Sequence, residues 1–212
     1  MRAPLPPAGT VTRLLPTVGI GRVPDKTTSE VAVAGTTAYT GTWGGEDEVY
    51  VWDVLRTTPE LIQQISIGKV AAVSDVQVSD DHKLVVASGE GGDDGGITIF
   101  TRLADGRLQF VGRHRTDSRS GAHTVKLGRV NGRLYAFMMA PPRILVVDIT
   151  DPANPQRIGS FQPSTQYTHD IFVRDGLLFS ADWDDGIGIW DLGGGNLGAT
   201  PANPKLISRL KS

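Results

Sequence analysis

The sequence predicts an all-β protein, a β-propeller of four four-stranded blades. Three observations support this prediction: a segment pattern that recurs four times, short alternating strands separated by turn residues, and an almost complete lack of helical periodicity. Four strands in each unit of about 40 to 50 residues are typical of propeller blades. The alternative is a β-sandwich, which also strings short strands together but has no reason to repeat its sequence four times.

The innermost strand of each blade is predicted from a segment that opens with Ser or His and then alternates polar and apolar residues. The four segments start 45, 49 and 46 residues apart, at Ser29, Ser74, His123 and His169. Innermost strands pack between neighbouring blades, so we expect their alternate valine, isoleucine and leucine side chains to be buried.

The other strands of each blade follow from two further anchors. The third strand contains an aromatic or apolar residue that recurs at intervals of 48, 47 and 43, at Trp52, Phe100, Val147 and Trp190. The outermost strand closes each unit, as in PELIQQISI and NPKLISRL. The predicted repeats cover residues 12–212, with blades at about 29–67, 74–114, 123–161 and 169–210.

A predicted strand that belongs to none of the four blades precedes the first repeat. Residues 1–11 are predicted to be an irregular lead, whereas TRLLPTVGI at 12–20 resembles an outermost strand of a missing blade. The fourth repeat already has its own outermost strand, so we expect an open arc of a larger, six- to seven-bladed ring. Closure at four blades is the alternative. An open arc leaves blade faces unpaired, so the expected partners are the missing blades or further copies of the chain.

Composition excludes several classes of function. The chain has 21 Lys and Arg against 23 Asp and Glu, and its cations are scattered singly, so nucleic acid is not an expected partner. No apolar run is long enough for a transmembrane helix or for the core of a signal peptide. The absence of cysteine excludes disulfides and thiolate metal sites without fixing a compartment.

The strand entrances supply the candidate site residues. His123 and His169 occupy equivalent positions in their repeats, with Ser29 and Ser74 in the other two. The acidic residues that directly follow three of these four positions are Glu30, Asp75 and Asp170, and we expect them at the mouth of the central channel. Imidazole and carboxylate groups can converge there on a metal ion, with His123 and His169 as its ligands. Apart from such an ion, no cofactor is predicted. The alternative interpretation is that each residue bonds to the neighbouring blade and locks the blades together.

Four tryptophans fall at two repeated positions, Trp43, Trp52, Trp183 and Trp190. We interpret them as packing residues of the blades, because recurrence at equivalent positions is what repeated packing requires. The alternative is an aromatic platform for a carbohydrate.

One stretch resembles a known family. The sequence ILVVDITDPANPQRIGSF at 144–161 resembles the LVIVD-repeat proteins, in which an apolar strand ending in Val-Asp precedes a Ser/Thr-Asp-Pro-x-x-Pro turn. The other repeats depart from this motif: Thr101 replaces the aspartate in the second, and the fourth inserts GGGN before its Asn-Pro. The resemblance implies a bacterial propeller of more than four blades with an extracellular, periplasmic or cell-surface location. It supplies no catalytic residues.

Two classes of function follow from these patterns. The first is a non-catalytic scaffold, not an enzyme, that binds a protein, peptide or polysaccharide through its channel-face loops. The alternative is a metal-dependent propeller enzyme, an oxidoreductase or hydrolase, whose site at the channel mouth uses His123, His169 and acidic neighbours.

Overall fold

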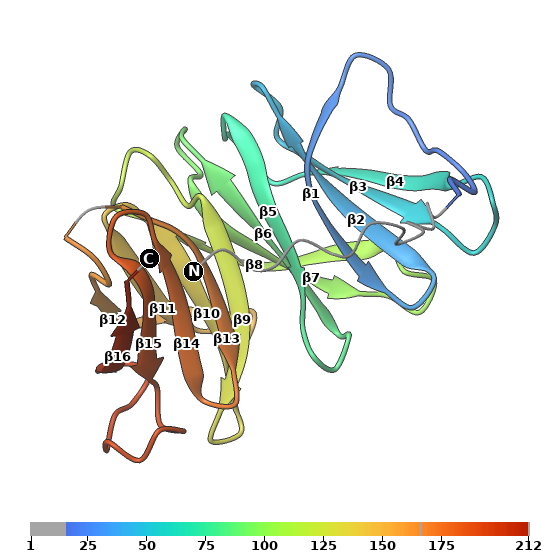
Figure 1. Cartoon of the computed structure of the whole chain (residues 1–212). Coiled ribbons are helices and arrows are strands. Elements are labelled where there is room, and N and C mark those ends of the chain that lie inside the picture. The colour runs from blue at the N-terminus through green and yellow to red at the C-terminus, as the bar shows by residue number, and fades with distance from the viewer. Residues whose placement is uncertain (1–15, 166, 212) are drawn as a thin grey trace, which may run out of the picture.

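The computed structural model describes residues 16–165 and 167–211, which form sixteen strands in four antiparallel sheets (Figure 1). No helix occurs in these ranges. The prediction of an all-β fold with four four-stranded blades is therefore confirmed.

Every blade is a meander whose four strands pair in chain order. The first blade contains β1 (Thr27–Ala34), β2 (Thr37–Trp43), β3 (Glu48–Asp53) and β4 (Glu60–Ser66). The second contains β5 (Ala72–Val78), β6 (Leu84–Glu90), β7 (Gly96–Arg102) and β8 (Leu108–Arg115). The third contains β9 (Thr124–Val130), β10 (Arg133–Ala140), β11 (Arg143–Asp148) and β12 (Gln156–Phe161). The fourth contains β13 (Thr168–Arg174), β14 (Leu177–Asp182), β15 (Gly186–Asp191) and β16 (Lys205–Leu210).

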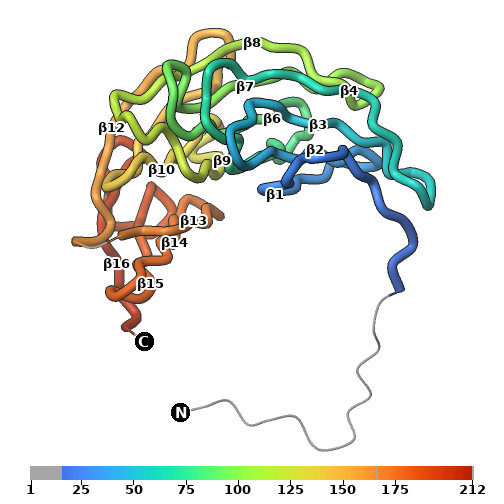
Figure 2. The backbone as a smooth tube through the Cα atoms, turned by 90° about the horizontal axis from the view of Figure 1, so that it is seen from above, coloured from blue at the N-terminus to red at the C-terminus, as the bar shows by residue number. Residues whose placement is uncertain are grey.

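The blades form an open arc (Figure 2). The first strands of the blades lie on its concave side and the fourth strands on its outer side, and the arc stays open between the fourth blade and the first. A larger ring of six to seven blades stays a prediction. Of the predicted leading strand, residues 12–15 lie outside the described residues, and residues 16–20 form no strand, with Val18 and Ile20 exposed.

The second strands are apolar on both faces because each internal blade lies between two others. In β6, Val85 and Ala87 pack in the cluster shared with the first blade, whereas Val86, pointing the other way, packs in the cluster shared with the third. Such strands lose the apolar-polar alternation of a half-exposed sheet. Each of the three blade–blade contacts therefore contains one core cluster, and a fourth cluster of Ala38, Tyr50 and Trp52 lies in the first blade.

The innermost strands agree with the expected burial only where another blade precedes them. Val76, Val125 and Ile171 are buried as predicted. Val31 and Val33 are exposed instead, because β1 belongs to the end blade and no blade packs against that side of it.

Candidate functional site

The strand entrances identified from the repeats lie at irregularities of the sheets. The register between the first two strands shifts between Thr28 and Val31, between Val73 and Asp75, and between Thr168 and Asp170. A bulge adds an unpaired residue and redirects its side chain, and bulges are frequent beside active sites. His123, the equivalent residue of the third blade, lies just before β9, where its N–H donates to the carbonyl of Met139 at 2.8 Å.

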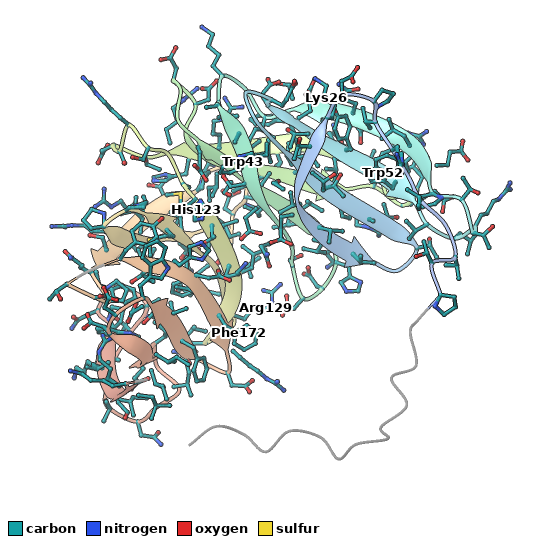
Figure 3. The ribbon with its side chains drawn as sticks, turned by 45° about the horizontal axis from the view of Figure 1, so that its top comes forward. Lys26, Trp43, Trp52, His123, Arg129 and Phe172 are labelled. Carbon is teal, nitrogen blue, oxygen red and sulfur yellow. The ribbon has the colours of Figure 1, made fainter. Side chains whose placement is uncertain are left out.

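A cavity of about 400 Å³ lies where these entrances meet. Four of the predicted site residues line it: Glu30, His123, His169 and Asp170. Trp43 and Lys126 also line it, and Figure 3 labels Trp43 and His123, which come from the first and third blades. The structure therefore brings together residues from β1, β9 and β13 that are distant in the sequence.

His123 is paired with Glu90, a residue that the sequence patterns did not indicate. Glu90 ends β6, and its Oε1 accepts a hydrogen bond from Nδ1 of His123 across the blade boundary. This bond outweighs the opposing effect of burial and raises the pKa of His123 above its ordinary value. Burial would raise the pKa of Glu90, but the bond with His123 prevails and lowers it. A neutral His123 with its proton on Nδ1 leaves Nε2 as a proton acceptor.

His169 belongs to an aromatic cluster at the mouth. Its ring meets that of His123 edge to face, with centroids 5.2 Å apart, and stacks on Trp183 at 6.1 Å and an interplanar angle of 18°. Trp183 and Trp43 are exposed, whereas Trp52 is buried and Trp190 packs in the third core cluster. The packing interpretation thus holds for Trp52 and Trp190, and Trp43 and Trp183 offer aromatic surface to a ligand.

Asp75 lies beneath the cavity and does not line it. Its carboxylate is buried and accepts hydrogen bonds from the Val125 N–H at 3.1 Å, Lys126 Nζ at 2.9 Å and Gln77 Nε2 at 2.8 Å. Burial opposes the charge of Lys126, but the nearby carboxylate of Asp75 outweighs it and raises the pKa of Lys126. The expectation of a channel-mouth ligand at Asp75 is therefore corrected: this residue joins the second blade to the third.

The remaining acidic candidates have modest local contacts. Asp170 Oδ1 lies 3.6 Å from Lys126 Nζ and accepts a hydrogen bond from the Ile171 N–H at 2.8 Å. Glu30 is exposed and accepts from the Val31 N–H at 2.9 Å. Both carboxylates face the cavity with oxygen atoms available to a ligand.

The predicted metal ligands are neighbours without a third ligand. Within residues 16–165 and 167–211, no group of three or more His, Cys, Asp or Glu side chains has the placement to hold a metal ion. His123 also has its Nδ1 engaged with Glu90, and its ring meets His169 edge to face. A carboxylate that holds one nitrogen of an imidazole is an arrangement found in acid–base pairs, and the metal site at His123 and His169 stays a prediction.

The pair Glu90–His123 could not be found from spacing within a repeat. The two residues are 33 positions apart and belong to different blades, so the contact depends on how blades pack. The available signal was the acidic residue at the end of β6, directly before a glycine-rich turn. Lys126 was missed for the same reason, because its partners Asp75 and Asp170 lie in the two blades on either side.

Comparisons with known proteins support the fold. No family model matches the chain, and no curated protein matches it by sequence. Among solved structures, a provisionally named 6-phosphogluconolactonase from Bacteroides uniformis matches with a TM-score of 0.70 and 14% identity over 91% of this chain and 59% of its own. The periplasmic gluconolactonase PpgL of Pseudomonas aeruginosa matches with 0.66 and 12%, over 87% and 57%. The computationally designed protein Ika4 matches with 0.57 and 17%, over 85% and 100%.

The chain therefore spans less than two thirds of the length of the lactonase structures that it matches. At these identities the likeness establishes a β-propeller fold. Two of these neighbours are named as lactonases, which goes against our prediction of a non-catalytic scaffold, and that prediction was wrong. The alternative, an enzyme with its site at the channel mouth, has the better support.

Two further expectations concern the family of the protein and its relation to membranes. The resemblance to LVIVD-repeat proteins stays a prediction, because no family model matches the chain and none of the neighbours named above carries that family's name. The described part of the chain contains no helix that is long and apolar enough to cross a membrane.

Proposed function

We propose that this chain is part of a propeller hydrolase that opens sugar lactones, with His123 as its general base. One observation carries the proposal: His123 lines the channel-mouth cavity, and its Nδ1 is hydrogen-bonded to the carboxylate of Glu90. The neighbours named as gluconolactonases support the choice of a lactone as substrate.

The proposed reaction adds water across the lactone ester bond. Glu90 holds the Nδ1 proton of His123, so Nε2 takes a proton from water as the water oxygen attacks the carbonyl carbon. The bond between that carbon and the ring oxygen then breaks, and the protonated His123 returns its proton to the ring oxygen. The product is an open-chain hydroxy acid, and its new carboxyl group releases one proton to solvent.

Other residues of the cavity would bind the substrate. Thr124 lines the cavity, and its Oγ1 is a buried polar atom with no hydrogen-bond partner among the described residues, so a polar ligand that reached it would supply the missing partner. The exposed rings of Trp43 and Trp183 would pack against the apolar face of a sugar ring. The carboxylates of Glu30 and Asp170 would accept hydrogen bonds from sugar hydroxyls.

A substrate panel tests the proposal. We expect gluconolactone to be hydrolysed above its spontaneous rate, and a glycoside and a phosphate monoester of similar size to be left intact. Product can be followed by proton release at constant pH. Hydrolysis of the glycoside or phosphate ester without the lactone would refute the assignment.

The activity should rise with pH through the titration of His123. Only neutral His123 can accept a proton, and its bond to Glu90 raises its pKa above 6.5, so half-maximal kcat/KM is expected above pH 6.5. Glu90→Gln removes the charge that raises this pKa and leaves the opposing effect of burial. The midpoint should therefore move to lower pH in that variant. If Glu90→Gln leaves the midpoint unchanged, the pH dependence of kcat/KM does not arise from the titration of His123 beside Glu90.

An unphosphorylated lactone is the expected substrate. Lys126 is the one lysine or arginine among the described residues of the cavity wall, and it is already engaged with Asp75 at 2.9 Å and Asp170 at 3.6 Å. A phosphate would instead meet Glu30 and Asp170, and like charges disfavour binding. We expect kcat/KM for gluconolactone to exceed that for its 6-phosphate by about tenfold, and the gap to narrow at higher salt. A preference for the phosphorylated lactone would contradict this assignment.

We also propose an extracytoplasmic location. The resemblance to LVIVD-repeat proteins implies it, and one neighbour is named a periplasmic gluconolactonase. Fractionation of cells that express the complete gene tests it, and recovery in the cytoplasmic fraction would be evidence against it.

A further inference from the structure

Each end blade presents a sheet face that meets no other blade among the described residues. On the first blade this face carries Val31 and Val33 of β1, and we call it the first open face. On the fourth blade it carries Phe172, Phe179 and Ile187, and we call it the last open face. Figure 2 shows both end blades bordering the gap of the arc, and Figure 3 labels Phe172.

The last open face has the residues of an internal blade face. In the first three blades the position equivalent to Ile187 is held by Val49, Ile97 and Ile144, and each of these side chains is 0% exposed. Ile187 is 47% exposed and the neighbouring Phe172 is 55% exposed. A shallow hollow of about 180 Å³ lies between Phe172, Phe179 and Ile187. The fourth blade thus carries an apolar contact surface without the blade that would cover it.

The first open face has the residues of the opposite side of a blade–blade contact. Val76 and Val125, the equivalents of Val31 in the second and third blades, are both 0% exposed, whereas Val31 is 55% exposed. They are buried because the innermost strand of each blade packs on the innermost and second strands of the blade before it, as β5 packs on β1 and β2. The strand β1 has the same residue types and no such neighbour.

The segment before β1 leaves this contact region free. Residues 16–26 pass over the outer part of the first blade, where Val23 packs with Tyr50 and Trp52. Val31 and Val33 remain outside that cover. The uncovered part is therefore the innermost strand, the same part that forms each internal blade–blade contact.

We propose that two copies of the chain close one ring of eight blades, with the last open face of each copy on the first open face of the other, in place of the six- to seven-bladed ring expected from the sequence. The two faces are unlike, and together they are the two sides of the contact that already occurs three times within the chain. A cyclic two-fold arrangement satisfies both faces of both copies and leaves none exposed. It also completes the wall of the channel that holds the Glu90–His123 pair, and it does not depend on the reaction proposed above.

The oligomeric state of the 212-residue chain tests this proposal. Light scattering coupled to size exclusion should give twice the 22.6 kDa chain mass at micromolar concentration. Val31→Glu and Phe172→Glu each place a charge in a different face, and each should give a monomer. Phe110→Glu is the matched control: Phe110 is 54% exposed but lies on the outer strand β8, so this variant should stay dimeric.

Mixing the two monomeric variants shows whether each is folded and has lost only one interface, or has lost its fold. In a mixed ring the Val31→Glu copy still offers an intact last open face, and the Phe172→Glu copy still offers an intact first open face. One of the two interfaces is therefore unaltered, and dimers should return only on mixing. A monomeric wild-type chain would overturn the proposal, and so would a dimer that neither substitution weakens.

Discussion

Replacing His123 with alanine should lower kcat/KM for sugar-lactone hydrolysis by about 100- to 10,000-fold, the usual contribution of a positioned general base. The structure gives the reason: the Nδ1 of His123 is held by Glu90, and the side chain lines the cavity where the lactone would bind. The loss should appear in kcat more than in KM, because proton transfer occurs in the reaction step and not on binding.

Two further variants, Glu90→Gln and His82→Asn, test this prediction. Glu90→Gln keeps a hydrogen-bonding side chain but removes the charge that favours the protonated imidazole formed during the reaction, so an intermediate loss is expected. His82→Asn is the matched control, because His82 is exposed in the β5–β6 turn with a positive φ of 58°, a conformation that asparagine accepts. If His82→Asn lost as much activity as His123→Ala, the assignment of the base would be refuted.

Replacing Asp75 with alanine should lower the free energy of unfolding by about 3 kcal/mol, because it leaves Lys126 partly buried without its main partner. The Val125 N–H and the Gln77 side chain lose an acceptor in the same step. Asp170, at 3.6 Å, still faces Lys126, which keeps the expected loss at the lower end for a broken buried ion pair. Denaturant titration of the purified variant measures the loss.

Asp93→Ala is the control for this substitution. Asp93 and Lys69 form an exposed pair 3.9 Å apart, and such pairs contribute at most about 1 kcal/mol. The double variant Asp75→Ala with Lys126→Met should recover part of the stability, because no buried charge is then left unpaired. Equal effects of Asp75→Ala and Asp93→Ala would show that Asp75 does not join the second and third blades as described.

The fold was predictable from the sequence because blade packing imposes the same residue types on every repeat. Val49, Ile97 and Ile144 fill one position in three successive blades, and the recurrence of such positions marks the strands. The same logic predicted burial for Val31, which is exposed. The repeat pattern specifies which side chains face a neighbouring blade, but it does not specify whether the chain supplies that blade.

The candidate site was predictable only in part, for a related reason. The strand entrances identified His123 and His169, which do lie together at the channel mouth. Their surroundings depend on contacts outside the strand entrance: Glu90 comes from the blade before His123, and Trp183 stacks on His169 from the turn after β14 of the same blade. Periodicity within a repeat carries no information about such pairings. The Glu90–His123 contact, on which we base the proposed acid–base pair, therefore could not be predicted from the repeats.

The most direct test of the central claim is the rate of proton release from gluconolactone at constant pH, with and without the wild-type chain. We predict a rate that exceeds spontaneous hydrolysis, is proportional to protein concentration and is lost in His123→Ala. A wild-type rate equal to the spontaneous rate, measured on folded protein in its assembled state, would contradict the proposed hydrolase.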